Sequence, residues 1–475
     1  MTTPFNPASI PQPPEPAWSM LGWTPQDADR IPEIWSGEVL VIGGGSAGSA
    51  AATAAARTGA RTLVVENGGF FGGTAAAVLD TMYGFFPPGS GDRVVGGIGW
   101  EIASRLLDSD AAFLRPNTYG AGTGVTYEPE ALKLLWDHTI ADSGATALLH
   151  ARMSGVILDG AAIRGALVVT RRGPYRISAA RVIDATGDAE VAWAAGCALE
   201  MPDASRRVQP LTTTFRVGGV TTPPPTAELH RLMREAAATG EYKLPRLEGS
   251  AHRTMLPGIY HTNMTRVSGV DSTNPWAATA AEIQGRRQAA EYARFLHDKV
   301  PGYENSYLLG TSVWAGTRET RRLLGEYVLT KDDVLQARQF DDAIALCGAP
   351  VEDHDGGSGT IWQYVGNPDG EGAPTGRTYG VPYRSLLPVD AENLIVAGRC
   401  LSATHDAHAS ARSIGQCLAY GQAAGTAAAL SIQQGIRLRE LPAGDLRERL
   451  ADDGVILDRP GGASRPGRVH EEASR

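Results

Sequence analysis

Residues 38–66 read EVLVIGGGSAGSAAATAAARTGARTLVVE, and this stretch decides the fold class of the chain. Residues 39–42 are a short apolar run that suits a buried parallel strand, and Gly43, Gly45 and Gly48 follow it in the spacing G-x-G-x-x-G. In this motif the first glycine allows a tight turn, the second lets the backbone approach a pyrophosphate, and the third lets the helix lie close to the strand. The stretch therefore predicts a strand–turn–helix unit that binds a dinucleotide.

A helix and a second strand complete this unit. The alanine-rich stretch 47–56 is a strong helix former, and the free N–H groups at its start, beside Ser46 and Ala47, favour a phosphate. Residues 62–65 are the next apolar run, and Glu66 closes the unit eighteen residues after the last glycine of the motif. A carboxylate at this place accepts hydrogen bonds from an adenosine ribose. An ordinary glycine turn is the alternative, but all four parts fall at the spacing that a dinucleotide site requires.

The segment after Glu66 favours FAD over NAD. It reads NGGFFGGTA and brings Asn67, Gly73 and Thr74 into a second cluster of small and polar residues. No later stretch contains a second complete G-x-G-x-x-G unit, so the sequence indicates no separate NAD(P)H domain. We therefore expect FAD as the cofactor. The sequence does not decide between covalent and non-covalent attachment.

An amphipathic helix and a β-meander follow. Residues 127–138 have the pattern of the helix, and residues 148–188 read as successive short strands joined by turns. The expected hairpin positions are Asp159-Gly160 and Arg172-Gly173. We assign Met153, near the start of the first of these strands, to the cofactor site.

The meander ends in a buried strand, 181–185, that runs into a small turn. A strand that ends in Ala-Thr-Gly places a small turn where the adenine half of a flavin can pass, although a simple strand-to-loop turn explains the residues equally well. The cofactor residues expected here are Ala185, Thr186, Gly187 and Asp188.

Near the C-terminus, residues 393–397 are another buried strand, and Gly398 and Arg399 follow it. A small-residue helix is then expected from Arg412, with Ile414 and Gly415 in its first turn. We assign Gly398, Arg399, Ile414 and Gly415 to the cofactor site.

The bulk properties limit the class of protein. The 475 residues carry a net charge of −9, which argues against a nucleic-acid partner held by phosphate neutralisation, and the densest basic cluster is Arg318, Arg321 and Arg322. The four cysteines form no CxxC pair, which fits a reducing compartment. No signal peptide or membrane-spanning stretch is visible, so we expect a cytoplasmic protein.

Several stretches together resemble the FAD-dependent oxidoreductase family. This family of glutathione-reductase-like Rossmann flavoproteins is distantly similar to fumarate-reductase-type and tRNA-modifying flavoproteins. The matching stretches are VIGGGSAGSAAA, ENGGFFGGTA, VIDATGDAEVAWAAG, TRETRRLLGEYVLTKDDVL, VPYRSLLP and NLIVAGRCLSATHDAHASARSIGQCLAYGQAAGTAAA. The resemblance implies that the helix from Arg412 points its N-terminus at the flavin pyrimidine, where its dipole stabilises negative charge.

The resemblance also implies the domain order. We expect an α/β fold, in which a Rossmann-type FAD-binding domain with an inserted β-meander carries a mixed α+β substrate or cap domain. The expected segments are a Pro/Trp-rich extension (1–36), the first part of the FAD-binding domain (37–200), the substrate or cap domain (201–380), the C-terminal part of the FAD-binding domain (381–455) and a disordered tail (456–475). The extension departs from the family pattern, is too rich in proline for a regular helix, and has three tryptophans to anchor it: Trp18, Trp23 and Trp35.

The cap domain is predicted to contain helices at 225–237 and 275–300 and a helix start at Thr330, where Asp333 completes a capping pattern before residues 334–340. Residues 221–225 and 356–376 are expected loops. The second is long enough for a lid, and a plain surface excursion is the alternative.

Three residues are candidates for catalysis. The resemblance places ATHDAHAS at the flavin, so His405 is the first candidate for a proton donor or acceptor and His408 the second. The alternative for His405 is a hydrogen bond to the flavin or to a carbonyl. Arg318 is predicted to bind a substrate carboxylate or to donate a proton, or else to form an ion pair with Glu319 or Glu326.

Two further residues receive structural interpretations. His354 can reach the pocket from its loop, but a metal site with Asp353 and Asp355 is improbable because adjacent positions rarely converge on one ion, so we assign no metal. Cys400 is expected to be a small packed residue.

The favoured function is a flavin dehydrogenase or oxidase that acts on a small organic substrate with an unknown electron acceptor. A flavin monooxygenase is the alternative, although such enzymes usually carry Gly-Asp where this chain has Gly398-Arg399. An RNA-modifying flavoprotein is disfavoured by the negative charge. A non-catalytic flavoprotein stays open.

Overall fold

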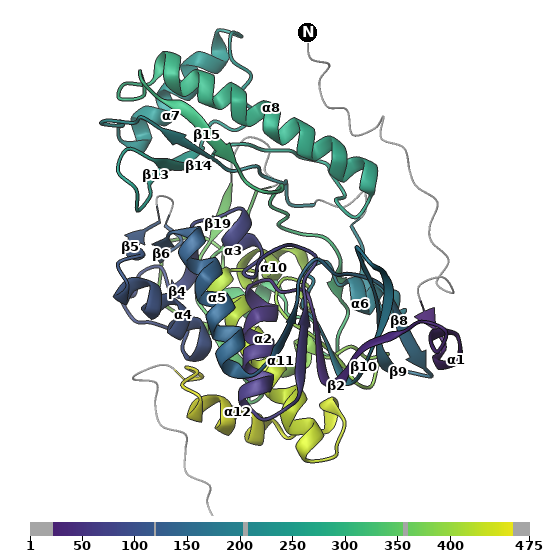
Figure 1. Cartoon of the computed structure of the whole chain (residues 1–475). Helices are drawn as coiled ribbons and strands as arrows, with labels where there is room; N and C mark the ends of the chain where they lie inside the picture. The colour runs from purple at the N-terminus through teal and green to yellow at the C-terminus, as the bar shows by residue number, and fades with distance from the viewer. Residues whose placement is uncertain (1–21, 118–119, 203–207, 355–359, 459–475) are drawn as a thin grey trace, which may run out of the picture.

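The centre of the molecule is a twisted parallel sheet (Figure 1). The computed structural model describes residues 22–117, 120–202, 208–354 and 360–458. Five strands lie in the order β21 (Leu394–Val396), β10 (Gly173–Asp184), β2 (Glu33–Ile42), β3 (Thr62–Val65) and β7 (Thr146–Leu148), and all four pairings are parallel. The last four residues of β2 and all of β3 are buried, which explains their continuous apolar runs. The expected Rossmann-type α/β fold is confirmed.

The strand β10 belongs to two parts of the sheet. Its first half pairs antiparallel with β9 (Ala162–Thr170), which pairs with β8 (Arg152–Asp159), so the three strands form the predicted meander. Its second half lies between β2 and β21 in the parallel sheet. The predicted buried strand 181–185 is therefore the end of the last meander strand, and the meander grows directly out of the central sheet.

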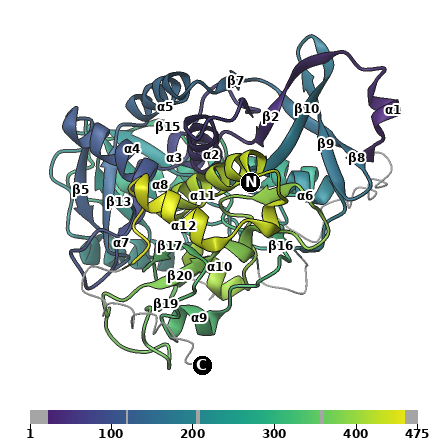
Figure 2. The same ribbon diagram turned by 90° about the horizontal axis from the view of Figure 1, so that it is seen from below.

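Two helices pack closely together beside the sheet. They are α2 (Ser46–Arg57), which follows the glycine motif, and α11 (Ile414–Gln433), and both views show them side by side (Figures 1 and 2). A Cβ atom on Gly421 or Gly425 of α11 would lie 2.0 or 2.1 Å from a carbonyl oxygen of α2. The glycines therefore permit the contact that joins the C-terminal part of the chain to the first βαβ unit.

A second body lies above the sheet in Figure 1. Its four-stranded sheet has the order β13 (Ser250–Arg253), β14 (Tyr260–Asn263), β12 (Phe215–Gly218) and β15 (Tyr307–Thr311). The helices α7 (Thr226–Ala238) and α8 (Pro275–Lys299) pack with it and confirm the two predicted cap helices. Its own hydrophobic core draws on residues 215–303, whereas residues 323–387 contribute to the core of the main body although the expected cap extends to 380.

The remaining elements surround these two bodies. They are α3 (Thr74–Ala77), β4 (Thr81–Phe86), α4 (Gly97–Asp108), β5 (Ala112–Pro116), β6 (Thr123–Tyr127), α5 (Pro129–Ser143), α6 (Glu190–Ala194), β11 (Leu199–Glu200), β16 (Arg322–Leu323), α9 (Lys331–Leu335), β17 (Ala343–Cys347), β18 (Val351–Asp353), β19 (Ile361–Gln363), β20 (Tyr379–Pro382), α10 (His405–Ala411) and α12 (Ala443–Asp452). In the part of the chain that the structure describes, no helix is long and apolar enough to cross a membrane.

The N-terminal segment is more regular than predicted. β1 (Gly22–Trp23) pairs with β8, α1 (Pro25–Ala28) is a short helix, and β2 already begins at Glu33. The prediction of no helix here is wrong because a proline is tolerated in the first turn, where its missing N–H has no partner to lose. Trp23 and Trp35 pack against buried residues as expected, and Trp18 lies outside the described residues.

Three other expectations need correction. The helix predicted at 127–138 begins at Pro129, because Tyr127 ends strand β6. The helix after Thr330 has the predicted capping box but ends at Leu335, short of 340. The predicted loop 356–376 contains β19, which pairs with β18, and its first residues lie outside the described part.

The C-terminal end also differs from the expected tail 456–475. Leu457 is buried in the main core, and residues 459–475 lie outside the described residues.

Candidate active site

The glycine motif forms a tight turn at the start of α2. Gly43 has φ +94°, a conformation that side chains with a Cβ rarely adopt, and a Cβ on Gly48 would lie 1.7 Å from the carbonyl oxygen of Gly43. Gly45 has open space above it, since its Cβ would meet nothing nearer than Gly73 at 3.9 Å. Ser46 and Ala47 then open the helix. The turn therefore leaves room and free N–H groups for a phosphate.

The second glycine cluster lies against this turn. The N–H of Gly72 donates to the carbonyl of Gly44 at 2.9 Å, and Gly45 and Gly72 form a parallel bridge. Gly73 caps α3, and the exposed Thr74 is the first residue of that helix. The sequence shows only that the second glycine cluster follows the glycine motif along the chain. The structure shows that the two segments lie against each other and form one cofactor cradle.

The carboxylate of Glu66 is held by the backbone. One oxygen accepts the N–H of Gly44 at 2.7 Å and the other accepts the N–H of Gly68 at 2.6 Å. Asn67 beside it is exposed, and half-buried Met153 lies two residues beyond Ala151, whose N–H donates to the carbonyl of Glu66. The carboxylate is half-buried and oriented, as a ribose acceptor must be.

The strand ends of β10 and β21 meet on the other side of the turn. Ala185 is buried, and half-buried Thr186 and Gly187 follow it; a Cβ on Gly398 would lie 2.8 Å from the Cβ of Ala47 at the start of α2. Arg399 donates to Asp188 at 2.8 Å. Burial would raise the pKa of Asp188, but Arg399 and Thr320 outweigh it and hold this pKa below its ordinary value.

The N-terminus of α11 completes the set. Ile414 is half-buried and Gly415 is buried in its first turn, and a Cβ on Gly415 would lie 3.0 Å from the carbonyl oxygen of Tyr83. The structure therefore gathers the glycine turns, the two strand ends and this helix start around the first βαβ unit.

His405 is the first residue of α10 and carries two carboxylate neighbours. Its Nδ1 lies 2.9 Å from Oε2 of Glu319, and its Nε2 lies 3.6 Å from Oδ1 of Asp353. Nε2 is buried and has no hydrogen-bond partner within the described chain. Because an ionised carboxylate only accepts, Glu319 fixes the proton on Nδ1 and leaves Nε2 as the acceptor nitrogen of the ring.

His408 is placed differently. Its side chain has no exposed surface, and its Nε2 donates to the carbonyl of Arg399 at 2.7 Å. Burial and the nearby Arg322 and Arg412 keep its pKa well below the ordinary value. A fully enclosed neutral imidazole cannot meet a substrate, so the structure makes His408 a positioning residue for the segment after β21 and speaks against its predicted catalytic role.

Arg318 has none of the expected ion pairs. Glu319 pairs with Arg322 and His405 instead, and Glu326 pairs with Arg439. The guanidinium of Arg318 donates to the carbonyl of Pro210 at 2.6 Å. The alternative of an ion pair with Glu319 or Glu326 is therefore wrong.

The neighbours in TRETRR are not a surface patch. Arg321 lies over the ring of Trp193 at 4.4 Å, and Arg322 is buried in ion pairs with Glu319 and Glu200.

Cys400 is fully buried, as predicted for a packed residue.

Sequence reasoning did not assign the carboxylates and arginines of the network that includes His405. Glu319 is the one acid in the basic run TRETRR, and Arg412 stands in a stretch of mostly small residues, so both charges were usable signals. The sequence carried no signal for Glu352, Arg246 and Arg266, because tertiary contacts alone bring them to the site.

His354, which the sequence placed within reach of the pocket, is nearly buried. Its Nε2 lies 3.0 Å from Oε1 of Glu352.

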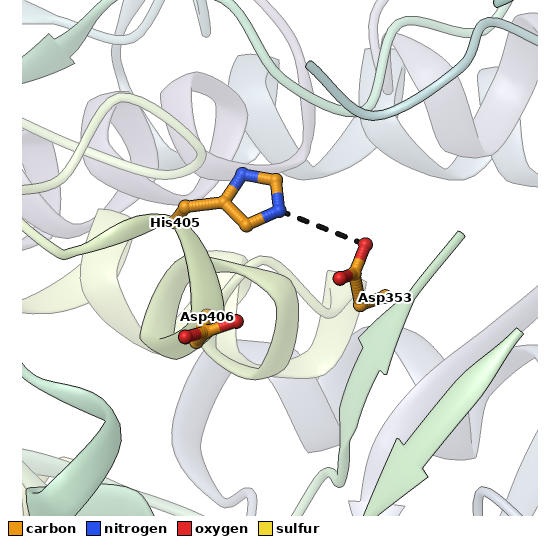
Figure 3. A group of neighbouring side chains, drawn as sticks. All are labelled: Asp353, His405 and Asp406. Carbon is orange, nitrogen blue, oxygen red and sulfur yellow. Dashed lines mark ion pairs between the residues drawn. The ribbon is translucent and has the colours of Figure 1, made fainter. Parts of the chain in front are cut away.

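One group in the described residues has the composition of a metal site. The ligand atoms of Asp353, His405 and Asp406 lie within 4.8 Å of one another, and Figure 3 shows His405 directed toward Asp353. Tetrahedral zinc with bonds of about 2 Å needs ligand atoms roughly 3.5 Å apart. Asp406 lies 3.8 Å from the ammonium of Lys331, so ion pairs account for this group and we assign no metal to it. Asp355 lies outside the described residues.

Residues 38–450 match the family model described as FAD dependent oxidoreductase. The chain belongs to this family. FAD is thus its cofactor, and the resemblance seen in the sequence is confirmed. The residues present fit this group, since the space above Gly45 and the oriented Glu66 carboxylate suit a pyrophosphate and a ribose.

No curated protein matches this FAD-dependent oxidoreductase significantly. Similar solved structures include the p-nitrophenol 4-monooxygenase PnpA from Pseudomonas putida DLL-E4, with 11% identity, a TM-score of 0.48 and coverage of 89% of this chain and 88% of that one. A geranylgeranyl bacteriochlorophyll reductase-like protein from Thermoplasma acidophilum has 12% identity and a TM-score of 0.44, covering 88% and 84%. The flavin-dependent brominase Bmp2 has 13% identity and a TM-score of 0.46, covering 88% and 84%.

Proposed function

We propose that this FAD-dependent oxidoreductase is a dehydrogenase or oxidase that transfers a hydride between a small organic substrate and N5 of the flavin. The observation that carries the proposal is the pairing of His405 with Glu319, which leaves one ring nitrogen free of hydrogen-bond partners. FAD supplies the hydride acceptor when it is bound. His405 takes the proton that leaves the substrate's O–H or N–H group.

The surroundings of His405 support an oriented base. Glu319 is only 2% exposed and also accepts the N–H of Gln209 at 3.1 Å. Arg322 pairs with the same carboxylate, so Glu319 is fixed from three sides. Such a carboxylate sets the tautomer and the orientation of the imidazole.

Anaerobic reduction of the purified enzyme by a panel of small alcohols, amines and hydroxy acids tests the proposal. A substrate that bleaches the flavin is the expected result, and His405→Gln should retain FAD while bleaching slows by about 100-fold or more. His138→Gln, on the exposed side of α5, is the matched control and should react as the wild type does.

Two outcomes contradict this proposal. One is a His405→Gln variant that bleaches at the wild-type rate. The other is a flavin that is reduced by a nicotinamide cofactor but by no substrate, which would favour a monooxygenase.

A further inference from the structure

Two arginines, on segments that adjoin His405 and its partner Glu319, have no carboxylate partner in the described part of the chain. Within the described residues, Arg318 donates to the carbonyl of Pro210 at 2.6 Å and Arg412 donates to the carbonyl of Glu352 at 3.3 Å, and neither lies within 4.0 Å of a carboxylate oxygen. Both side chains are half-buried, and Nε of Arg412 is buried without a hydrogen-bond partner. These contacts leave several guanidinium N–H groups unused.

The charges around the pair are incompletely compensated. Burial, together with the neighbouring Arg412 and Arg246, lowers the pKa of Arg318 to about 9, against the opposite effect of Glu352. Burial likewise lowers the pKa of Arg412, although Glu352 and Asp353 act in the opposite direction. An anion placed between two such groups would restore the balance of charge.

The nearest carboxylate is already engaged. Oε1 of Glu352 lies 3.0 Å from Nε2 of His354. Burial would raise the pKa of Glu352, but His354, Arg412 and Arg318 outweigh it and lower this pKa to about 2. Glu352 therefore stays ionised and orients His354, and it does not close an ion pair with either arginine.

More positive charge lies behind the pair, on the cap. Arg246 and Arg266 are 4% and 6% exposed, and they share Glu248 at 3.6 and 3.4 Å. The hydroxyl of Thr360 also donates to Glu248, and it lies 3.0 Å from Nδ1 of His354. One continuous network thus runs from the cap arginines through His354 and Glu352 to Arg412.

The positions of Arg318 and Arg412 along the chain relate the pair to His405. Arg318 immediately precedes Glu319, which holds His405, and Arg412 caps the C-terminal end of α10, which begins at His405. Arg412 donates to the carbonyl of Glu352, and the next residue, Asp353, lies 3.6 Å from Nε2 of His405. The pair therefore lies on the segments that hold the imidazole.

We propose that Arg318 and Arg412 bind the carboxylate of the substrate, which makes the substrate a small organic acid. Guanidinium groups bind carboxylates through two parallel hydrogen bonds, and this fixes orientation as well as charge. The bound carboxylate directs the neighbouring carbon toward His405. This inference rests on the proposed function and adds the substrate class to it.

Isothermal titration of the purified, FAD-containing protein with malonate and with malonamide tests the inference. The two probes have the same shape but differ in charge. Malonate should bind and malonamide should not, and Arg318→Gln and Arg412→Gln should each raise the Kd of malonate at least tenfold. Arg286→Gln removes an exposed arginine of α8 that pairs with Glu282, and it should leave the Kd unchanged.

The visible spectrum of each variant reports whether FAD is retained and the protein folded. The comparison of the two probes on the wild type needs no variant, so equal binding of malonate and malonamide, or none, overturns the inference. Unchanged malonate binding in both arginine variants also overturns it. If malonate binds as expected but no substrate bleaches the flavin, the anion site stands and the proposed hydride transfer fails.

Discussion

Nδ1 of His405 lies 2.9 Å from Oε2 of Glu319, although 86 residues separate the two along the chain. This contact joins the start of α10 to the segment that leaves the cap body. It also defines which ring nitrogen carries the proton, since the carboxylate can only accept a hydrogen bond.

Substitution of Glu319 tests this contact. Glu319→Gln should retain FAD but slow flavin reduction by about 100-fold, because an amide can both donate and accept and so does not fix the tautomer of the ring. The measurement is stopped-flow bleaching of the flavin under anaerobic conditions. Glu326→Gln, which breaks a partly exposed ion pair with Arg439, is the control. Equal rates for Glu319→Gln and the wild type would show that the contact is only structural.

Substitution of Glu66 tests the cofactor cradle. Glu66→Ala should weaken FAD binding by about 10- to 100-fold, as expected for loss of hydrogen bonds to a charged group worth about 1.5–3 kcal/mol. Glu38→Ala is a close control, because Glu38 also accepts a backbone N–H, that of Arg61 at 2.7 Å, on the exposed side of the unit. FAD retention is measured by fluorescence after dilution. Equal loss of FAD from both variants would mean that the adenosine site lies elsewhere.

The contact between α2 and α11 predicts a loss of stability. Gly425→Ala places a methyl group 2.1 Å from the carbonyl oxygen of Ala51, so the helices must separate, and the free energy of unfolding should fall by about 1–3 kcal/mol. Gly444→Ala, in α12, has nothing within 4 Å and should be neutral or stabilising by roughly 0.5–1 kcal/mol. Urea denaturation measures both. A Gly425→Ala variant as stable as the wild type would contradict the close packing.

A buried histidine between the two bodies predicts a pH dependence of stability. His261 of the cap faces Asp80 at 3.6 Å, and burial lowers its pKa to about 4 although Asp80 acts in the opposite direction. The unfolded chain takes up this proton near the ordinary value of 6.5, so the free energy of unfolding should fall as the pH drops from about 6.5 to about 4.

Replacing this side chain should remove its part of the slope. His261→Phe should lose on the order of 1–3 kcal/mol less than the wild type across that interval, as measured by urea denaturation at several pH values. His138→Gln should keep the wild-type slope. The interpretation is wrong if His261→Phe and the wild type lose stability in parallel.

The local parts of the fold were predictable from the sequence. The strand Thr62–Val65 and the capping box at Thr330 and Asp333 agree with the prediction residue for residue. The strand is recognised by its run of apolar residues and the capping box by two side chains within one turn. Both can therefore be predicted from residues that are close in sequence.

Two features could not be predicted from neighbouring residues. They are the pairing of β10 with strands of both the meander and the parallel sheet, and the contacts among the charged residues of the site. β10 takes β9 and β21 as partners along one edge, which no local pattern encodes. His405 was chosen from a resemblance, but Glu319 and the pair Arg318 and Arg412 come together only through tertiary contacts. The sequence also allowed an ion pair of Arg318 with Glu319, yet the structure turns that carboxylate to His405 and Arg322.

The most direct test of the account is the visible spectrum of the purified protein during anaerobic addition of small organic acids. The account predicts the two-band spectrum of oxidised flavin, release of FAD on denaturation, and bleaching by an acid that carries an O–H or N–H group next to its reacting carbon. Bleaching should be slow in His405→Gln and should need far more acid in Arg318→Gln. A protein that takes up no FAD, or a flavin that no such acid reduces, would contradict it.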